Sequence, residues 1–277
     1  MKRRDVFVVV GVLVFFLLVL IFRARGNFDM FSTEIGVVRI TGTITNSEPL
    51  VKWIDELSKN KRIKGILLYI NSPGGSAVSS DEIYRAILRF KSKINRPVVA
   101  YISQVGASGG YYIACAADKI VINPSSITGS IGVIAEFPEF SGLLQKVGVK
   151  MRVIKSGAHK DIGSPFRDMT PQEKRIIERL IDQTYERFVE IVIKGRGLTE
   201  DSVRHIGDGR IFSGKEAVDV GLCDTTGDFT TAKEIMKKML NVSKIKEVEM
   251  KRPFSIKDLV LKSKLPYGMI LSYRMVP

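Results

Sequence analysis

A short apolar run, a glycine-rich turn and a helix occur twice in succession, and this pattern constrains the fold more than any other feature. In the first unit the apolar run is Ile66 to Ile70, and the turn is Asn71 to Gly75. In the second, the run Val98 to Ile102 precedes the turn Gly106 to Gly110. Apolar strands alternating with helices are typical of an α/β fold with a mainly parallel sheet. Ligands of such sheets bind at the carboxyl ends of the strands, where both turns lie.

The flanking segments supply further expected elements. Residues Ile35 to Ile40 are rich in β-branched side chains and predict a first strand, and Pro49 to Ser58 has apolar residues at helical spacing. After the first turn, a helix is expected to begin near Ser79 or Ser80. After the second, Tyr111 to Ala117 predicts a short apolar helix, and the run KIVIN that follows it predicts another strand.

A long helix is predicted from Thr170 to Lys194. Thr170 is its expected N-cap, with Pro171 at the first helical position and Glu173 completing a capping box. Two glycines, Gly195 and Gly197, should end it. Its apolar residues predict a broad face in the core or in a subunit contact: Ile177, Leu180, Ile181, Tyr185, Phe188 and Val192.

The N-terminus predicts a membrane anchor in residues 1–26. The run Val6 to Phe22 carries no charge and, as a helix of about 17 residues, would rise roughly 26 Å, close to what a bilayer core requires. Its bulky end differs from the small residues of a signal-peptide cleavage site. Three basic residues precede the run and two follow it, so the N-terminus is expected in the cytoplasm and the rest on the extracytoplasmic side of the cell membrane.

The remaining chain divides into one large domain, 27–250, and a basic C-terminal tail, 251–277. The net charge of +14 comes from lysines and arginines spread along the sequence without a nucleic-acid motif, so nucleic acid is not an expected partner. Scattered basic residues suit a domain tethered beside anionic lipid. The two cysteines, Cys115 and Cys223, lack metal-ligand spacing; one disulfide between them stays open, and neither a metal nor an organic cofactor is expected.

Ser108 is the candidate nucleophile. It lies in the run GASGG just before an apolar helix, where small neighbours admit substrate and a helix N-terminus favours developing negative charge. A backbone amide in the turn that holds Gly74 and Gly75, together with the amide of Gly109, could then form an oxyanion hole, because glycine lets the backbone approach a carbonyl closely. The alternative is that both glycine-rich turns serve only tight packing.

The general base is harder to choose from the residues alone. His159 and Asp161 could complete a Ser-His-Asp triad, but side chains two positions apart in so short a run are poorly placed for both roles. Lys160, between them, could act only if burial lowered its pKa from about 10.4 toward neutrality, and most lysines are exposed.

Four runs, in order, resemble the signal peptide peptidase A family of membrane-bound Ser-Lys proteases: NSPGGSAVSSDEIYRAI, GASGGYYIACAADKIVINPSSITGSIGVI, KSGAHKDIGSPFRDMTPQE and DGRIFSGKEAVDVGLCD. The similarity extends from Ile35 to about Leu240. It implies that Ser108 is the nucleophile and that Lys160, 52 residues later, is the base. It also implies that Gly75 belongs to the oxyanion hole.

The same resemblance implies that Ser130, in TGSIG, hydrogen-bonds the lysine. It further implies a ClpP/crotonase-like superfold and a ring-shaped homo-oligomer with shared active sites, so that Lys160 of one chain could serve Ser108 of its neighbour. The expected function is an endopeptidase that degrades residual signal peptides or other hydrophobic peptides. The alternatives are a protease specific for a stomatin-like membrane protein, an acyl-CoA hydratase or thioesterase, and an inert oligomeric scaffold.

Overall fold

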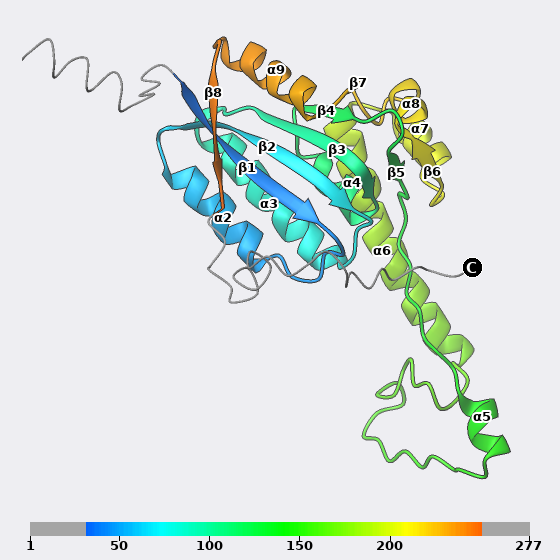
Figure 1. The fold of residues 1–277 in the computed structure, drawn as a ribbon. Helices are drawn as coiled ribbons and strands as arrows, with labels where there is room; N and C mark the ends of the chain where they lie inside the picture. Colours follow the sequence, from blue (N-terminus) through cyan, green and yellow to red (C-terminus); the bar gives the residue numbers. More distant parts are fainter. Residues whose placement is uncertain (1–31, 251–277) are drawn as a thin grey trace, which may run out of the picture.

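The computed structural model of the chain describes residues 32–250, whose strands form an eight-stranded sheet (Figure 1). The strands are β1 (Thr33–Thr41), β2 (Ile63–Ser72), β3 (Val98–Ala107), β4 (Lys119–Ile122), β5 (Ile127–Gly129), β6 (Ile211–Ser213), β7 (Thr225–Thr226) and β8 (Ile245–Glu249). The main path of the sheet has the order β6-β5-β3-β2-β1-β8, and β4 pairs with β3 and β7. These pairings are parallel apart from that between β5 and β6, which confirms the expected mainly parallel α/β sheet.

The sheet branches along β3. The first half of β3 pairs with β4, from Val99 opposite Lys119 onward, whereas its last residues pair with β5, ending with Ala107 opposite Gly129. The carboxyl end of β3 therefore has β2 on one side and β5 on the other. Ser108 is the residue that directly follows this end of β3, which is paired on both sides.

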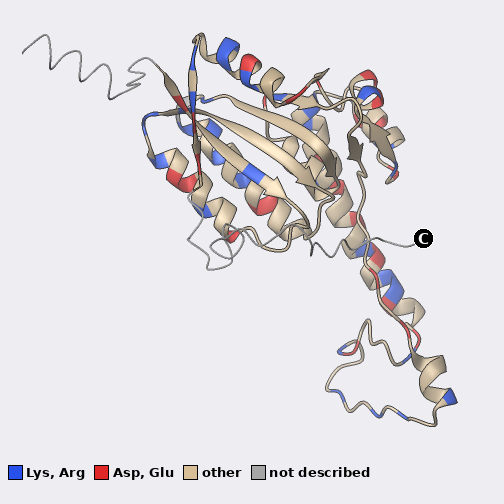
Figure 2. Cartoon of the chain, in the orientation of Figure 1, with Lys and Arg blue, Asp and Glu red and all other residues tan. Residues whose placement is uncertain are grey.

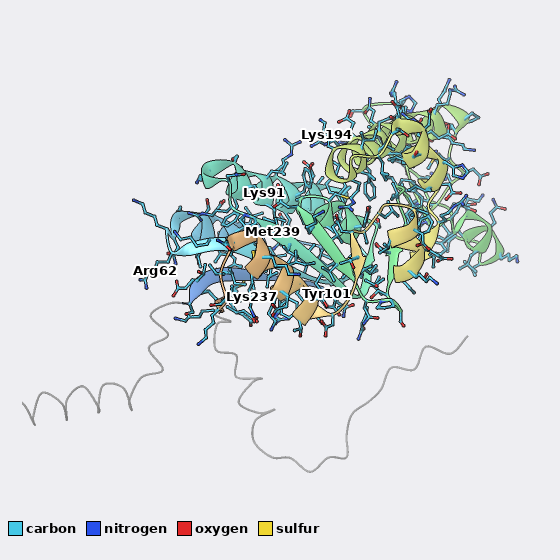
Figure 3. The ribbon with its side chains drawn as sticks, turned by 90° about the horizontal axis from the view of Figure 1, so that it is seen from above. Arg62, Lys91, Tyr101, Lys194, Lys237 and Met239 are labelled. Atoms are coloured by element: carbon cyan, nitrogen blue, oxygen red, sulfur yellow. The ribbon has the colours of Figure 1, made fainter. Side chains whose placement is uncertain are left out.

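Helices cover both faces of the sheet (Figure 1). They are α2 (Glu48–Lys59), α3 (Ala77–Ile94), α4 (Gly109–Ala114), α5 (Ser141–Lys146), α6 (Pro171–Arg196), α7 (Glu200–Ile206), α8 (Gly214–Asp219) and α9 (Phe229–Leu240). Because strand side chains alternate between faces, Val38 joins the cluster under α2, α3 and α4, while Val37 packs with Met236 of α9. Seen from above, α9 crosses the strands with Tyr101 close to its start (Figure 3).

The predicted strands and helices up to β4 are present, with shifted ends. The first helix after a glycine turn begins at Ala77 rather than near Ser79, because the Ser76 side chain caps it by accepting a hydrogen bond from the Ser79 amide at 3.2 Å. β3 extends to Ala107, into the predicted turn, because β5 supplies it with a partner. The short strands β5 to β8 were not predicted, since runs of two to five residues carry too little periodicity.

The long helix α6 confirms the predicted capping box of Thr170 and Glu173. It continues through Gly195 and ends at Gly197, which adopts the left-handed conformation. The expected apolar face is buried only in its C-terminal half, at Phe188 and its neighbours; Leu180, in the N-terminal half, is 53% exposed. That half of α6 extends away from the sheet (Figure 1), a placement that helical periodicity does not encode.

Residues 134–170, called the arm below, run alongside the free half of α6 and around its free end, and they include α5 (Figure 1). No residue of the arm is buried. Large apolar side chains along it are exposed: Ile134, Phe137, Phe140, Leu143, Val147, Val149, Met151, Val153, Ile154 and Phe166. Lysines and arginines recur along the arm and on several helices rather than on one element (Figure 2). The arm therefore has no core of its own within this chain.

The predicted anchor, 1–26, and the predicted tail, 251–277, lie outside the described residues. Within residues 32–250, no helix combines the length and the apolar character needed to span a bilayer.

Candidate active site

Ser108 occupies a strained junction between β3 and α4. Its backbone has φ of 50° and ψ of −122°, a conformation that costs a residue with a side chain about 1–3 kcal/mol. Two hydrogen bonds hold it there: the Ser108 amide donates to the Gly129 carbonyl, and the Ser108 carbonyl accepts from the Tyr112 amide, both at 2.9 Å. The side chain is half-buried, and its hydroxyl has no hydrogen-bond partner within residues 32–250. Such enforced strain at a half-exposed hydroxyl is typical of a nucleophile.

The Pro-Gly-Gly turn after β2 packs directly against this junction. A Cβ atom on Gly74 would lie 2.7 Å from the Gly109 nitrogen and 2.8 Å from the Ser108 Cβ. Ser72, at the end of β2, secures the turn from below: its hydroxyl donates to the Gly42 carbonyl at 2.6 Å and accepts from the Gly74 amide at 3.1 Å. The structure thus brings together the two glycine-rich turns, as expected for neighbouring parallel strands.

Two glycine amides at this place are unpaired. Gly75 is held by Ile44, which donates to the Gly74 carbonyl at 2.8 Å and accepts from the Ser76 amide at 2.7 Å. These bonds leave the Gly75 amide without an acceptor among residues 32–250, and the amide of Gly109 is likewise unpaired there. Unpaired amides beside a serine hydroxyl are the groups that an oxyanion hole requires.

Ser130 lies next to Ser108 across the β3–β5 pairing. It directly follows Gly129, which accepts the Ser108 amide, and its own amide donates to the Arg210 carbonyl at 2.8 Å. Like Ser108, it has a positive φ, of 50°. The buried Thr128 hydroxyl donates to the Gly106 carbonyl at 2.6 Å and secures the two strands to each other. Strand β5, which the sequence did not reveal, thus places Ser130 beside Ser108.

Lys160 is not part of this constellation within one chain. It belongs to the loop between α5 and α6, and this loop lies in the arm, away from the sheet that carries the two turns (Figure 1). The residue is exposed, its amide donates to the Gly157 carbonyl at 3.1 Å, and its amine has no partner among residues 32–250. A single chain therefore gives this amine neither the burial nor the contact with Ser108 that a general base needs.

An arginine fork, which sequence reasoning missed, lies beside Lys160. Arg167 donates to both carboxylate oxygens of Asp161, at 2.9 and 2.8 Å, and to both of Glu173, at 2.9 and 2.6 Å. Hydrogen bonds from Arg167, and then from Lys155, hold the pKa of Asp161 well below its ordinary value. Arg167, followed by the Thr170 amide, lowers the pKa of Glu173 to about 2. The sequence does contain a signal for this fork, because an acidic residue lies six residues before Arg167 and another lies six residues after it.

The hydrogen bonds of Arg167 argue against the alternative Ser-His-Asp triad with His159 and Asp161. Asp161 is occupied by Arg167 and Lys155, so it is not free to orient His159. The His159 Nδ1 atom instead faces Glu173, at 3.9 Å from its Oε1 atom. The geometry of one chain therefore does not assemble a Ser-His-Asp site from these residues.

Residues 32–250 contain no cluster of three histidine, cysteine or acidic side chains that could hold a metal ion. Cys115 and Cys223 are buried free thiols in the structure, so the disulfide that the sequence left open is not formed there.

Two protein-family models match the part of the chain that holds this site. A family model described as peptidase family S49 matches residues 90–243, and one described as Clp protease matches residues 35–128. Together these ranges contain both glycine-rich turns, Ser108, Ser130 and Lys160.

Curated relatives agree with the family models. The chain is 40% identical over 199 residues to a putative protease of Methanocaldococcus jannaschii, which covers 72% of this chain and 63% of that protein. It is 37% identical over 206 residues to a putative signal peptide peptidase SppA of Enterococcus faecium, covering 74% and 60%. A putative protease of Synechocystis is 40% identical over 203 residues, covering 73% and 72%. The matched region thus spans about three fifths of the length of the first two relatives.

Proposed function

Because the chain belongs to peptidase family S49, we propose that it is a membrane-anchored serine endopeptidase in which Ser108 is the nucleophile and Lys160 the general base. The observation that carries this proposal is the strained, half-exposed Ser108 packed against the Pro-Gly-Gly turn, with the amides of Gly75 and Gly109 unpaired among residues 32–250. A packing turn would require neither a strained serine nor open amides.

The acylation step follows from these groups. The neutral amine of Lys160 takes the hydroxyl proton as the Ser108 oxygen bonds to the scissile carbonyl carbon. The resulting oxyanion accepts hydrogen bonds from the amides of Gly75 and Gly109. When the carbon–nitrogen bond breaks, the protonated amine returns its proton to the leaving amine, and the Ser130 hydroxyl keeps the lysine oriented. Water then attacks the ester carbon and gives one proton to Lys160. As the ester carbon–oxygen bond breaks, Lys160 passes that proton to the Ser108 oxygen, and the peptide acid leaves.

The site is completed, in this proposal, by a second copy of the chain. The arm has exposed apolar side chains and no core of its own, and Lys160 lies on it. Packing the arm against a neighbouring chain would bury those side chains and carry Lys160 to the neighbour's Ser108, where loss of water would favour the neutral amine. Repetition of such a head-to-tail contact generates a ring. The match to the Clp protease model supports a ClpP/crotonase-like superfold for the catalytic domain.

The proposed substrates are residual signal peptides and other hydrophobic peptides. One relative is named a putative signal peptide peptidase, and the apolar run Val6 to Phe22 would hold the domain at the extracytoplasmic face of the membrane, where such peptides remain after secretion. A scattered positive charge favours approach to anionic lipid.

A peptidase assay on the full chain in detergent tests the dyad. Ser108→Ala and Lys160→Ala should each abolish cleavage of a fluorogenic hydrophobic peptide, whereas His159→Ala should retain it. The proposal is wrong about the base if His159→Ala is inactive and Lys160→Ala is active.

Mixing the two inactive variants tests the shared site. Mixed oligomers of Ser108→Ala and Lys160→Ala contain some sites with an intact serine from one chain and an intact lysine from the next. Recovery of activity on mixing, with none in either variant alone, is expected. Absence of recovery under conditions where mass measurements show mixed oligomers would contradict a site shared between chains.

A further inference from the structure

The loop that carries Lys160 is secured by hydrogen bonds and charge rather than by burial. All residues from 151 to 160 are exposed, so apolar packing within the chain does not fix their conformation. Backbone bonds produce local turns, with the Ile162 amide donating to the His159 carbonyl at 3.2 Å and the Ser164 amide to the Asp161 carbonyl at 3.0 Å. These turns shape the loop but do not connect it to a regular element.

Arg167 makes that connection. Its guanidinium binds Asp161, the residue after Lys160, and also the carboxylate of Glu173 in the first turn of α6. All three guanidinium nitrogens donate hydrogen bonds in this arrangement. Glu173 is 1% exposed and also accepts from the Thr170 amide at 3.0 Å, so it is a rigid end point for the fork. A planar guanidinium binding two carboxylates edge-on restricts direction as well as distance.

We infer that Arg167 is a positioning residue for catalysis, which orients Lys160 by clamping Asp161 to the start of α6. This inference rests on the proposed function, in which Lys160 is the general base. A catalytic group must be held within roughly 0.5 Å of its working position, and exposed loops rarely meet that requirement without such support. The fork supplies it at the residue adjacent to the base.

The positive charge of Arg167 is expected to affect Lys160 in addition to the geometry of the fork. The charged and titratable groups around it are Asp161, Glu173, Arg167, Lys155, His159 and Asp168. Arg167 neutralises the two carboxylates that it binds, one of which belongs to the residue next to Lys160. Removing the arginine charge should therefore make the enzyme require a higher pH for activity, whereas removing only the fork geometry should not.

Two substitutions separate position from charge. Arg167→Lys keeps the charge but loses the fork, and its kcat should fall by roughly tenfold to a hundredfold with little change in KM, as expected for a misplaced catalytic group. Arg167→Gln also loses the charge, and the acid limb of its pH–rate profile should move to higher pH. Asp161→Asn should match Arg167→Lys in kcat, and combining the two should add little further loss because they remove one interaction.

The chain provides a matched control in Arg204. Its guanidinium also joins two carboxylates, between α6 and α7 and away from the arm, donating to both oxygens of Glu186 and to Oε1 of Glu200. Arg204→Lys should leave kcat unchanged. Titration with a serine-directed covalent probe counts the sites in each variant, so that a loss of folded enzyme is distinguished from a slower site.

The outcomes are distinct from those of the proposed function. If Lys160→Ala is inactive and Arg167→Lys keeps the kcat of Arg204→Lys per titrated site, the dyad stands and the positioning role is refuted. The same holds if Arg167→Gln loses activity only in proportion to its titrated sites, with an unshifted pH profile. If Lys160→Ala is fully active, the proposed function and this inference fail together.

Discussion

A methyl group at Gly74 should disable the site more than it unfolds the protein. Gly74 has φ of +99°, and a Cβ atom built on it would lie 2.7 Å from the Gly109 nitrogen, 2.8 Å from the Ser108 Cβ and 3.0 Å from the Ala107 carbonyl oxygen. All three contacts are with the nucleophile or with backbone next to it, so no flexible side chain can move aside. Gly74→Ala therefore transmits its clash to Ser108.

The expected size follows from these distances. To open 2.7 Å to the 3.4 Å at which ordinary contact begins, the turn and the Ser108 junction must separate by about 0.7 Å. Since a misplacement of about 1 Å can cost a hundredfold in rate, kcat should fall roughly tenfold to a hundredfold. Overpacking costs about 1–3 kcal/mol and the positive φ about 1 kcal/mol or more, so the free energy of unfolding should fall by about 2–4 kcal/mol.

Gly197→Ala is the matched control. Gly197 also has a positive φ, of 65°, at the C-terminus of α6, but within the described part of the chain its Cβ would meet no atom closer than 4 Å beyond those of its immediate chain neighbours and of the helix backbone itself. It should lose about 1–2 kcal/mol of stability through backbone strain alone and keep its kcat. Both variants are compared by peptide cleavage and by denaturant unfolding, with activity measured where each is fully folded. Equal kcat values for the two variants would refute the argument that the Pro-Gly-Gly turn sets the position of Ser108.

Buried side chains should affect stability and chemical accessibility. Tyr111→Phe removes the donor to the Leu222 carbonyl, a 2.8 Å bond between fully buried groups, and should lower the unfolding free energy by about 1–3 kcal/mol in urea titration; an unchanged midpoint would contradict this. Phe90→Ala, at a side chain 1% exposed, should cost about 3–5 kcal/mol in the same measurement, and a cost below that of Tyr111→Phe would show that the cavity collapses. Burial raises the pKa of Cys115 and of Cys223 to about 12, so both thiols should resist a colorimetric thiol reagent at pH 8 until denaturant is added; rapid labelling of the native protein would show that they are accessible.

Features encoded within a few residues were predictable from the sequence. The strands β1, β2 and β3 appear as runs of β-branched and aliphatic side chains, and the start of α6 follows from the Thr170 and Glu173 capping box, whose partners are three residues apart. The place of Ser108 between a strand and a helix was likewise readable, because small residues and an apolar run are adjacent in the chain. The identification of the signal peptide peptidase A family is confirmed by the comparisons.

Only the tertiary structure decided which of these residues meet. Pairing of β3 with β5 places Ser130 beside Ser108 and imposes the backbone strain at the nucleophile, although neither short strand nor strain has a local signature. Folding of α6 away from the sheet leaves Lys160 on an arm far from its expected partner and exposes half of a helix face predicted to be buried. The physical reason is that periodicity reports which side of an element is apolar, whereas the neighbour that covers that side is set by contacts distant in sequence, here including, in our proposal, a second chain.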